Sequence, residues 1–151
     1  MAQAGQRYNP TVSHGAPQFP RASQKHRVVK LHTANTAGLN LFTAYDTDYV
    51  AVNNEKHSEN LIVLPDTLIP AWTTAKVESL TTEDMDKLRA LGTEIILLGT
   101  GQRLRFPAGA LLRPFAAAGI GLDVMDMQAA CRTFNILASE GRKVAAALLF
   151  D

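Results

Sequence analysis

Two glycines and two arginines form the first group of residues whose types and spacing could do chemistry. Gly99, Thr100 and Gly101 directly follow a short apolar run, and Arg103 and Arg105 come next. Glycines after a strand let the backbone turn sharply and present N–H groups to an anion, and nearby arginines neutralise its charge. The pattern is therefore a candidate site for a phosphorylated or otherwise anionic small molecule.

The same stretch lacks the other residues of the phosphate-binding fingerprints. Leu104 stands where the dinucleotide fingerprint has its third glycine, and no P-loop lysine follows. Five residues separate Gly101 from Pro107, which suits the first position of the next helix. We therefore favour a structural glycine turn and keep the anion site as the alternative.

Polar residues around the next predicted strand and helix form a second group. Asp126 follows that strand, where α/β folds place functional groups, and Arg132 and Asn135 are expected on or beside the less apolar side of the helix. Asp123 and Asp126 could act as paired carboxylates, but Asp126 also suits a helix N-cap. We favour capping and surface ion pairs, and keep Asp126, Arg132 and Asn135 as candidate ligand-binding residues.

Cys131 is the single cysteine, and its thiol would need a neighbouring base to act as a nucleophile. Helical spacing places it on the inner face of a helix, where a free cysteine behaves as a small hydrophobe. The four histidines all precede residue 58 and have no metal-like spacing. We therefore predict no catalytic residue, no metal site and no cofactor. A lone cysteine also allows no internal disulfide, which favours a reducing, cytoplasmic setting.

The elements that must position these residues alternate between strand and helix. This order predicts a parallel sheet with right-handed crossovers. Apolar periodicity, caps and glycine stops predict a helix at 82–91, a doubly covered strand at 95–98, a helix at 108–118, a strand at 120–124, a helix from the Asp126 cap to Gly141 and a strand at 144–150.

The preceding residues predict further strands that extend or cover this sheet. Alternating apolar residues at 39–45 and 49–52 indicate a hairpin. The remaining expectations are a polar loop at 53–60, a strand at 61–64, an extended crossing from Pro65 to Pro70, and a short strand at 76–80.

The first 24 residues contain three prolines and no hydrophobic period, which predicts a disordered basic tail at 1–24 and a single α/β domain at 25–151. Residues 1–45 hold five bases and no acid. Since the whole chain has 15 bases and 14 acids, residues 46–151 hold 10 bases and 14 acids, a net charge of −4. The spread of the bases favours a solvated tail over a transit peptide or a nucleic-acid arm. No apolar run approaches the roughly 20 residues of a membrane helix, so we expect no membrane insertion.

Four motifs resemble a known family. They are the GTG turn with Arg103, Phe106 and Pro107, then AAGIGLDVMD, AACRTFNIL and EGRKVAAALL. They are similar to a family of small domains of unknown function that includes the mitochondrial respiratory complex I assembly factor 3 and the adipogenesis-associated domain protein. The likeness covers residues 27–149, and the chain looks like a bacterial-type member. The resemblance implies a three-layer α/β fold, with a central mixed, mostly parallel sheet, helices packed on it and an additional N-terminal β-hairpin layer.

The resemblance also implies a role in complex I assembly for the mitochondrial relatives, which bind assembly factors and subunits, and it carries over no catalytic residues. We therefore expect a non-catalytic binding or assembly factor with protein partners. The alternative is a small enzyme or sensor that binds an anionic ligand at residues 99–105. Nucleic-acid binding through the basic tail ranks third, because the remaining domain is acidic.

Overall fold

The computed structural model describes residues 29–30 and 38–151. The predicted tail at 1–24 and the domain boundary at residue 25 lie outside the described residues, so both stay predictions.

The described residues form two sheets, three α-helices and a short 3-10 helix. The strands are β1 (Val29–Lys30), β2 (Phe42–Tyr45), β3 (Val50–Val52), β4 (Glu55–His57), β5 (Leu61–Leu64), β6 (Thr67–Pro70), β7 (Ile95–Gly99), β8 (Gly121–Met125) and β9 (Val144–Leu148). The helices are the 3-10 helix η3 (Val77–Ser79), α1 (Thr82–Arg89), α2 (Gly109–Ala117) and α3 (Met127–Ser139).

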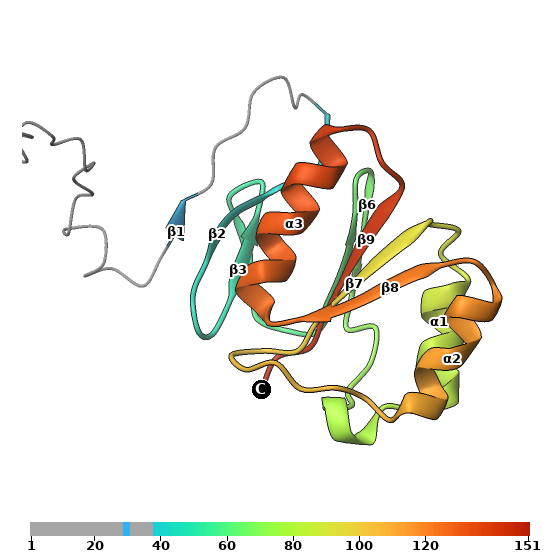
Figure 1. Cartoon of the computed structure of the whole chain (residues 1–151). Coiled ribbons are helices and arrows are strands. Elements are labelled where there is room, and N and C mark those ends of the chain that lie inside the picture. The colour runs from blue at the N-terminus through green and yellow to red at the C-terminus, as the bar shows by residue number, and fades with distance from the viewer. Residues whose placement is uncertain (1–28, 31–37) are drawn as a thin grey trace, which may run out of the picture.

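The central sheet is mixed, with the strand order β6-β5-β9-β7-β8. Strand β7 pairs in parallel with both β8 and β9, whereas β5 pairs antiparallel with β9 and with β6. Strands β1 to β4 form a separate antiparallel sheet built around the predicted β2–β3 hairpin. Figure 1 shows α3 and this smaller sheet on one side of the central sheet and α1 and α2 on the other. The layered α/β fold is therefore confirmed.

Two apolar clusters hold these layers together, one on each face of the central sheet. Leu97 and Ala146 belong to the cluster beneath α3 and the smaller sheet, while Ile96 and Leu98 belong to the cluster beneath α1 and α2. Successive residues of a strand point to opposite faces, so an unbroken apolar run suits a strand that is covered twice. The strand predicted at 95–98 is confirmed.

The predicted Asp126 cap is present, and Thr81 caps α1. The Asp126 carboxylate accepts a hydrogen bond from the Ala129 N–H at 2.9 Å. At the start of α1, the Thr81 hydroxyl accepts from the Asp84 N–H at 3.2 Å, and the Asp84 carboxylate accepts from the Thr81 N–H at 3.0 Å. Burial raises the pKa of Asp84, but hydrogen bonds from Thr81 and Thr73 and the positive charge of Lys87 together outweigh it and hold the pKa below its usual value.

Three predicted segments before the central strand are wrong. The loop at 53–60 contains β4, because Asn53 and Asn54 adopt positive φ angles of 49° and 71° and turn the chain back onto β3. The crossing at 65–70 is mostly β6, which forms a hairpin with β5. The strand expected at 76–80 is η3, where the Ser79 hydroxyl accepts from the Lys76 N–H at 3.0 Å and closes a local turn.

The helix after the glycine loop starts later than predicted. Pro107 is buried ahead of α2 and does not occupy its first position, because Ala108 is the N-cap. Pro114 lies inside α2, where it withholds one N–H from the helix. Phe115 is the buried residue of α2, and Ala118 at the end of the helix is exposed.

Asn135 fastens α3 to the smaller sheet. Its amide oxygen accepts from the Phe42 N–H at 2.9 Å and its amide nitrogen donates to the Phe42 carbonyl at 2.8 Å. The register of β2 against β3 shifts between Phe42 and Ala44, so the side chain completes the pairing of a strand residue at an irregularity. The predicted place of Asn135 on the less apolar side of the helix is wrong, since the residue is only 4% exposed.

Replacing Asn135 with alanine should lower the free energy of unfolding by about 2–4 kcal/mol, because the buried N–H and carbonyl of Phe42 both lose their partner. Urea unfolding followed by the fluorescence of buried Trp72 measures this loss. Gln128→Ala, at an exposed position of the same helix, is the matched control and should change stability by less than about 0.5 kcal/mol. A loss below about 1 kcal/mol for Asn135→Ala would contradict the assignment.

Candidate functional site

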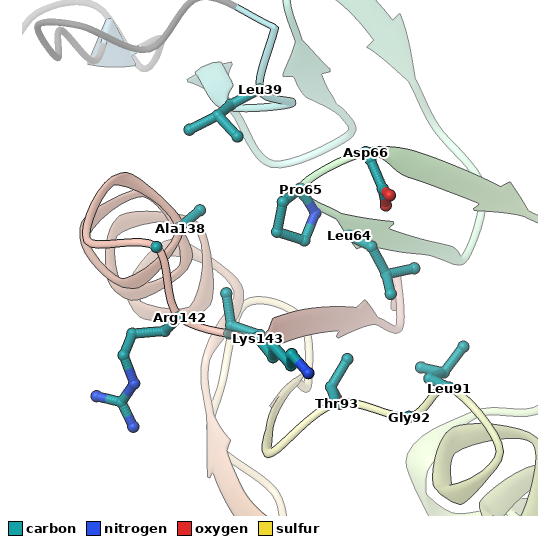
Figure 2. Close-up of a pocket in the computed structure, with 12 residues that line it drawn as sticks. Leu39, Leu64, Pro65, Asp66, Leu91, Gly92, Thr93, Ala138, Arg142 and Lys143 are labelled. Atoms are coloured by element: carbon teal, nitrogen blue, oxygen red, sulfur yellow. The ribbon is translucent and has the colours of Figure 1, made fainter.

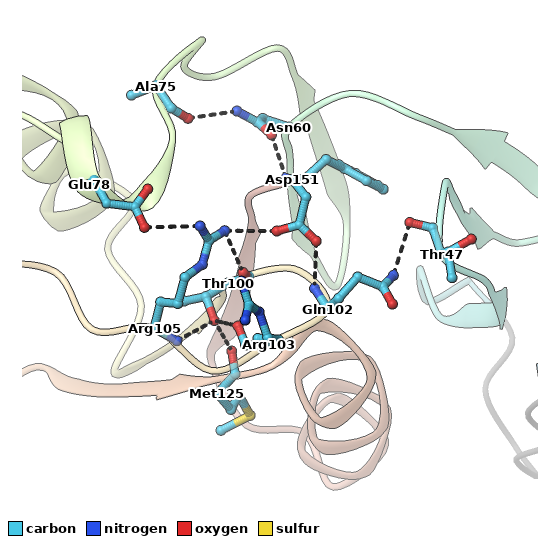
Figure 3. A network of polar contacts seen from close by, with 11 residues as sticks. Thr47, Asn60, Ala75, Glu78, Thr100, Gln102, Arg103, Arg105, Met125 and Asp151 are labelled. Atoms are coloured by element: carbon cyan, nitrogen blue, oxygen red, sulfur yellow. Dashed lines mark hydrogen bonds and ion pairs between the residues drawn. The ribbon is translucent and has the colours of Figure 1, made fainter.

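The candidate site lies where the three parallel strands end. Strands β7, β8 and β9 run in the same direction, and Gly99 pairs with both Met125 and Leu148 at their ends. The segments that follow these strands meet there, as Figure 3 shows. Ligands of open α/β sheets bind outside this edge, so it is the first place to look for a function.

The two glycines of the loop each have a structural reason. A Cβ atom on Gly99 would lie 2.8 Å from Leu148 Cδ2 and 3.1 Å from Ala130 Cβ, so only glycine lets α3 come this close to β7. Gly101 has a φ of 91°, a conformation that other residues rarely adopt, and its carbonyl accepts from the Met127 N–H at 2.8 Å. The turn therefore packs against the first residues of α3.

Thr100 holds the loop from within. The residue is fully buried, its hydroxyl lies 2.7 Å from the Arg103 carbonyl, and it accepts from the Arg105 N–H at 3.1 Å. The same hydroxyl also lies 3.3 Å from the Met125 carbonyl at the end of β8. One buried side chain thus connects both ends of the turn to the neighbouring strand.

Arg105 ties the loop to two other segments. Its guanidinium donates to Glu78 at 2.9 Å, to the Asp151 carboxylate at 2.8 Å and to the Thr100 carbonyl at 3.2 Å (Figure 3). The second oxygen of Asp151 accepts from the Gln102 N–H at 3.0 Å. An anion at this guanidinium would have to displace two carboxylates, so Arg105 acts in the structure as a brace.

Residues 102–106, called the braced loop below, carry two large apolar side chains that are exposed to solvent. Leu104 is 50% exposed and Phe106 is 66% exposed, and they flank Arg105 in the sequence. Leu104 and Phe106 were not predicted as functional residues. Their alternation with Arg103 and Arg105 in the sequence is a signal, but the same alternation is also typical of apolar residues that face a core.

The remaining candidates lie along α3. Asp126 is next to the glycine turn through the Met127–Gly101 hydrogen bond and caps the helix. Because Gly101 and Asp126 already accept from the Met127 and Ala129 N–H groups, an anion at this helix end would compete with both. Arg132 donates to the Tyr45 hydroxyl at 3.0 Å, and Asn135 holds Phe42, so both face the smaller sheet instead of the loop.

Cys131 is buried in the core, as predicted. Burial raises the pKa of its thiol far above the usual range, so the thiolate is not available. In residues 29–30 and 38–151, no three histidine, cysteine or acidic side chains are grouped closely enough to hold a metal ion. None of the helices described is long and apolar enough to cross a membrane.

Cys131 should be inert toward a soluble disulfide reagent in the folded protein, because its thiol is both buried and protonated. Absorbance of the released thiolate should show essentially no reaction under native conditions and one equivalent in denaturing guanidinium chloride. Rapid native labelling would show that the inner face of α3 opens.

Replacing Arg105 with glutamine should loosen the braced loop, because the loop loses its ties to Glu78 and Asp151. We expect a loss of about 1–2 kcal/mol in the free energy of unfolding and faster amide hydrogen exchange at residues 102–106. The matched control is Arg103→Gln, since the Arg103 side chain makes no hydrogen bond or ion pair to any described residue. Equal exchange in the two variants would rule out the brace.

These features define a layered α/β domain with a braced, apolar loop at the ends of its parallel strands. The chain belongs to the family described as "Protein of unknown function (DUF498/DUF598)", whose model matches residues 42–149. The resemblance inferred from the four motifs is confirmed.

Three relatives illustrate the range of the family. The chain is 28% identical to the Xenopus tropicalis "NADH dehydrogenase [ubiquinone] 1 alpha subcomplex assembly factor 3", covering 89% of the chain and 73% of that protein. It is 33% identical to a Francisella tularensis "13 kDa major membrane protein" over 48% of the chain, and it spans only 59% of that protein. A crystal structure of a Bordetella parapertussis protein matches with a TM-score of 0.70 and 36% identity, covering 76% of the chain and 98% of that structure.

Proposed function

We propose that the protein is a non-catalytic binding or assembly factor whose protein partner docks on the braced loop. The observation that carries this proposal is the exposure of Leu104 and Phe106 on a loop that Arg105 and Thr100 hold in place. Contiguous exposed apolar surface marks interaction sites, and Leu104 and Phe106 lie only two residues apart on one fixed loop.

The physical form of the loop suits protein recognition. Aromatic anchors at the centre of an interface supply much of its binding free energy once they enter a pocket on the partner. A loop that is already fixed loses little conformational entropy on binding. The charged residues around it, Arg103, Glu78 and Asp151, would form the polar rim of such an interface.

The relatives support a protein partner of a particular kind. The Xenopus relative is named as an assembly factor of NADH dehydrogenase, so we propose that the partner here is an assembly factor or a subunit of a respiratory-type complex. The Francisella relative is named a membrane protein, which suits a partner at a membrane. We propose that the protein itself works from the cytoplasm, since its free cysteine suits a reducing compartment.

The alternative is a small enzyme or sensor that binds an anion at residues 99–105. In this proposal Arg103 would be the main contact, because its side chain is exposed and the Arg105 guanidinium is held by two carboxylates. We rank this second, since Gly99, Gly101 and Thr100 already have packing and hydrogen-bonding roles in the turn. A phosphate-dependent rise in melting temperature that Arg103→Gln abolishes would favour it.

The double variant Leu104→Ser, Phe106→Ser should lose its partner while keeping its fold. Affinity purification of tagged full-length protein from its own cells, with quantitative mass spectrometry, should recover the principal partner at least about tenfold less well, because the apolar anchors are gone. Its melting temperature should stay within a few degrees of the wild-type value, since both side chains are exposed.

The matched control is Ile136→Ser. Ile136 is 58% exposed on α3, so this variant makes the same kind of apolar-to-polar change on another part of the surface. It should recover the partner as the wild type does. If the wild type, the double variant and Ile136→Ser all recovered the partner equally, the braced loop would not be the docking site.

A further inference from the structure

A hollow lies at the opposite end of the central sheet, where β7 and β9 begin. Four segments surround it: the residues just before β2, the β5–β6 turn, the α1–β7 connection and the α3–β9 connection. Its volume is about 430 Å³, within the range of roughly 300–1,000 Å³ in which small-molecule sites fall. It is called the strand-start pocket below.

The walls of the strand-start pocket are mainly apolar. Leu39, Leu64 and Leu91 are each half-buried, and Val144 is fully buried beneath them. Leu39 packs on the cluster under α3, whereas Leu64 and Leu91 pack on the cluster on the other face of the sheet. The pocket therefore opens between the two cores, and an apolar group placed there would cover side chains that water now reaches.

One positive charge is directed to the pocket. In Figure 2, the Lys143 side chain runs toward the Thr93 side of the pocket, while the Arg142 side chain points away from it. Arg142 is engaged outside, where it donates to Glu94 at 2.9 Å. The Lys143 ammonium has no hydrogen bond or ion pair to a described residue, so it could meet a ligand's charge without giving up an existing partner.

Two other polar groups belong to the pocket wall. Asp66 lies at the rim, is exposed, and accepts a hydrogen bond from the Thr67 hydroxyl at 3.1 Å. The Thr93 hydroxyl oxygen is buried and has no hydrogen-bond partner among the described residues. Rotation of the Thr93 side chain about χ1 to another staggered rotamer would move its hydroxyl group and could offer that donor to a ligand.

From this arrangement we infer that the strand-start pocket binds a small amphiphile that has an apolar body and a single carboxylate. The body lies between the leucines, and the carboxylate accepts from the Lys143 ammonium beside Thr93. This site is independent of the braced loop, since the two lie at opposite ends of the parallel strands.

The test uses the full-length, isotope-labelled protein and two probes of the same chain length, octanoate and 1-octanol. Octanoate should cause saturable amide NMR shifts at Gly92, Thr93 and Val144. Lys143→Met should weaken octanoate about tenfold, because one charge-assisted hydrogen bond is lost, and should leave 1-octanol within about twofold. Thr93→Val should weaken octanoate to a smaller extent.

The matched control is Arg142→Met, which removes a neighbouring cation that points away from the pocket. It should leave the octanoate affinity within about twofold of the wild-type value, since only long-range attraction is lost. The inference is overturned if octanoate causes no saturable shifts, if the shifts centre on the braced loop, or if Lys143→Met and Arg142→Met have equal effects. Equal affinity of Lys143→Met and the wild type for octanoate would show an adventitious apolar contact and would also overturn it.

Discussion

The structure depends on a close approach of layers over the middle strand of the central sheet. Strand β9 lies between β5 and β7 and carries Ala145, Ala146 and Ala147, all fully buried. Methyl side chains leave room for α3 on one face and for larger side chains such as Trp72 on the other, where the Trp72 indole donates to the Leu148 carbonyl at 3.2 Å. The same need for a small residue applies to Gly99 on β7, because a Cβ atom there would clash with α3. A larger residue along this line would separate the layers and lose contacts on both faces.

The two ends of the central sheet differ in whether their apolar side chains face outward or inward. Where the parallel strands end, Thr100 and the Arg105 guanidinium fill the space with hydrogen bonds, and the apolar side chains of the loop turn outward. Where they begin, the connections leave a hollow whose apolar walls face inward. The fold thus offers exposed apolar side chains at one end and an apolar-walled pocket at the other. Exposed aromatic and aliphatic anchors suit a macromolecular partner, whereas a pocket suits a small molecule.

The features that could be predicted from the sequence are those with a local signal. Asp126 and Thr81 each precede a helix with its hydrogen-bond acceptor in place, and the unbroken apolar run of β7 can be read from a few residues. The features that could not be predicted depend on residues far apart. Asn135 looks like a surface amide until β2 is placed beside it, and no local pattern shows that Arg105 meets Asp151.

Dependence on residues far apart in the sequence also explains why the exposed side chains of the braced loop and the strand-start pocket were not predicted. Leu104 and Phe106 are exposed only because neighbouring residues brace the loop from behind, and four separate segments make the strand-start pocket. Neither the exposure of these side chains nor the pocket can be predicted from a single stretch of the sequence. The short polar strand β4 was missed for a related reason, since Glu55 and Lys56 form a strand only because the preceding asparagines turn the chain back onto β3.

The two hydrogen bonds between Asn135 and Phe42 also have a consequence for folding during synthesis, because they join segments that are translated at different times. The two residues are 93 positions apart, so the smaller sheet leaves the ribosome long before the helix that holds it. Until α3 arrives, the apolar face of the β2–β3 hairpin has no partner and the unpaired edge at Phe42 can meet other chains. Contacts of such long sequence separation form slowly, because a large loop must close first. The nascent chain therefore passes through a period in which its first-made sheet lacks the helix that covers it, and that period ends only when the residues of α3 have been translated.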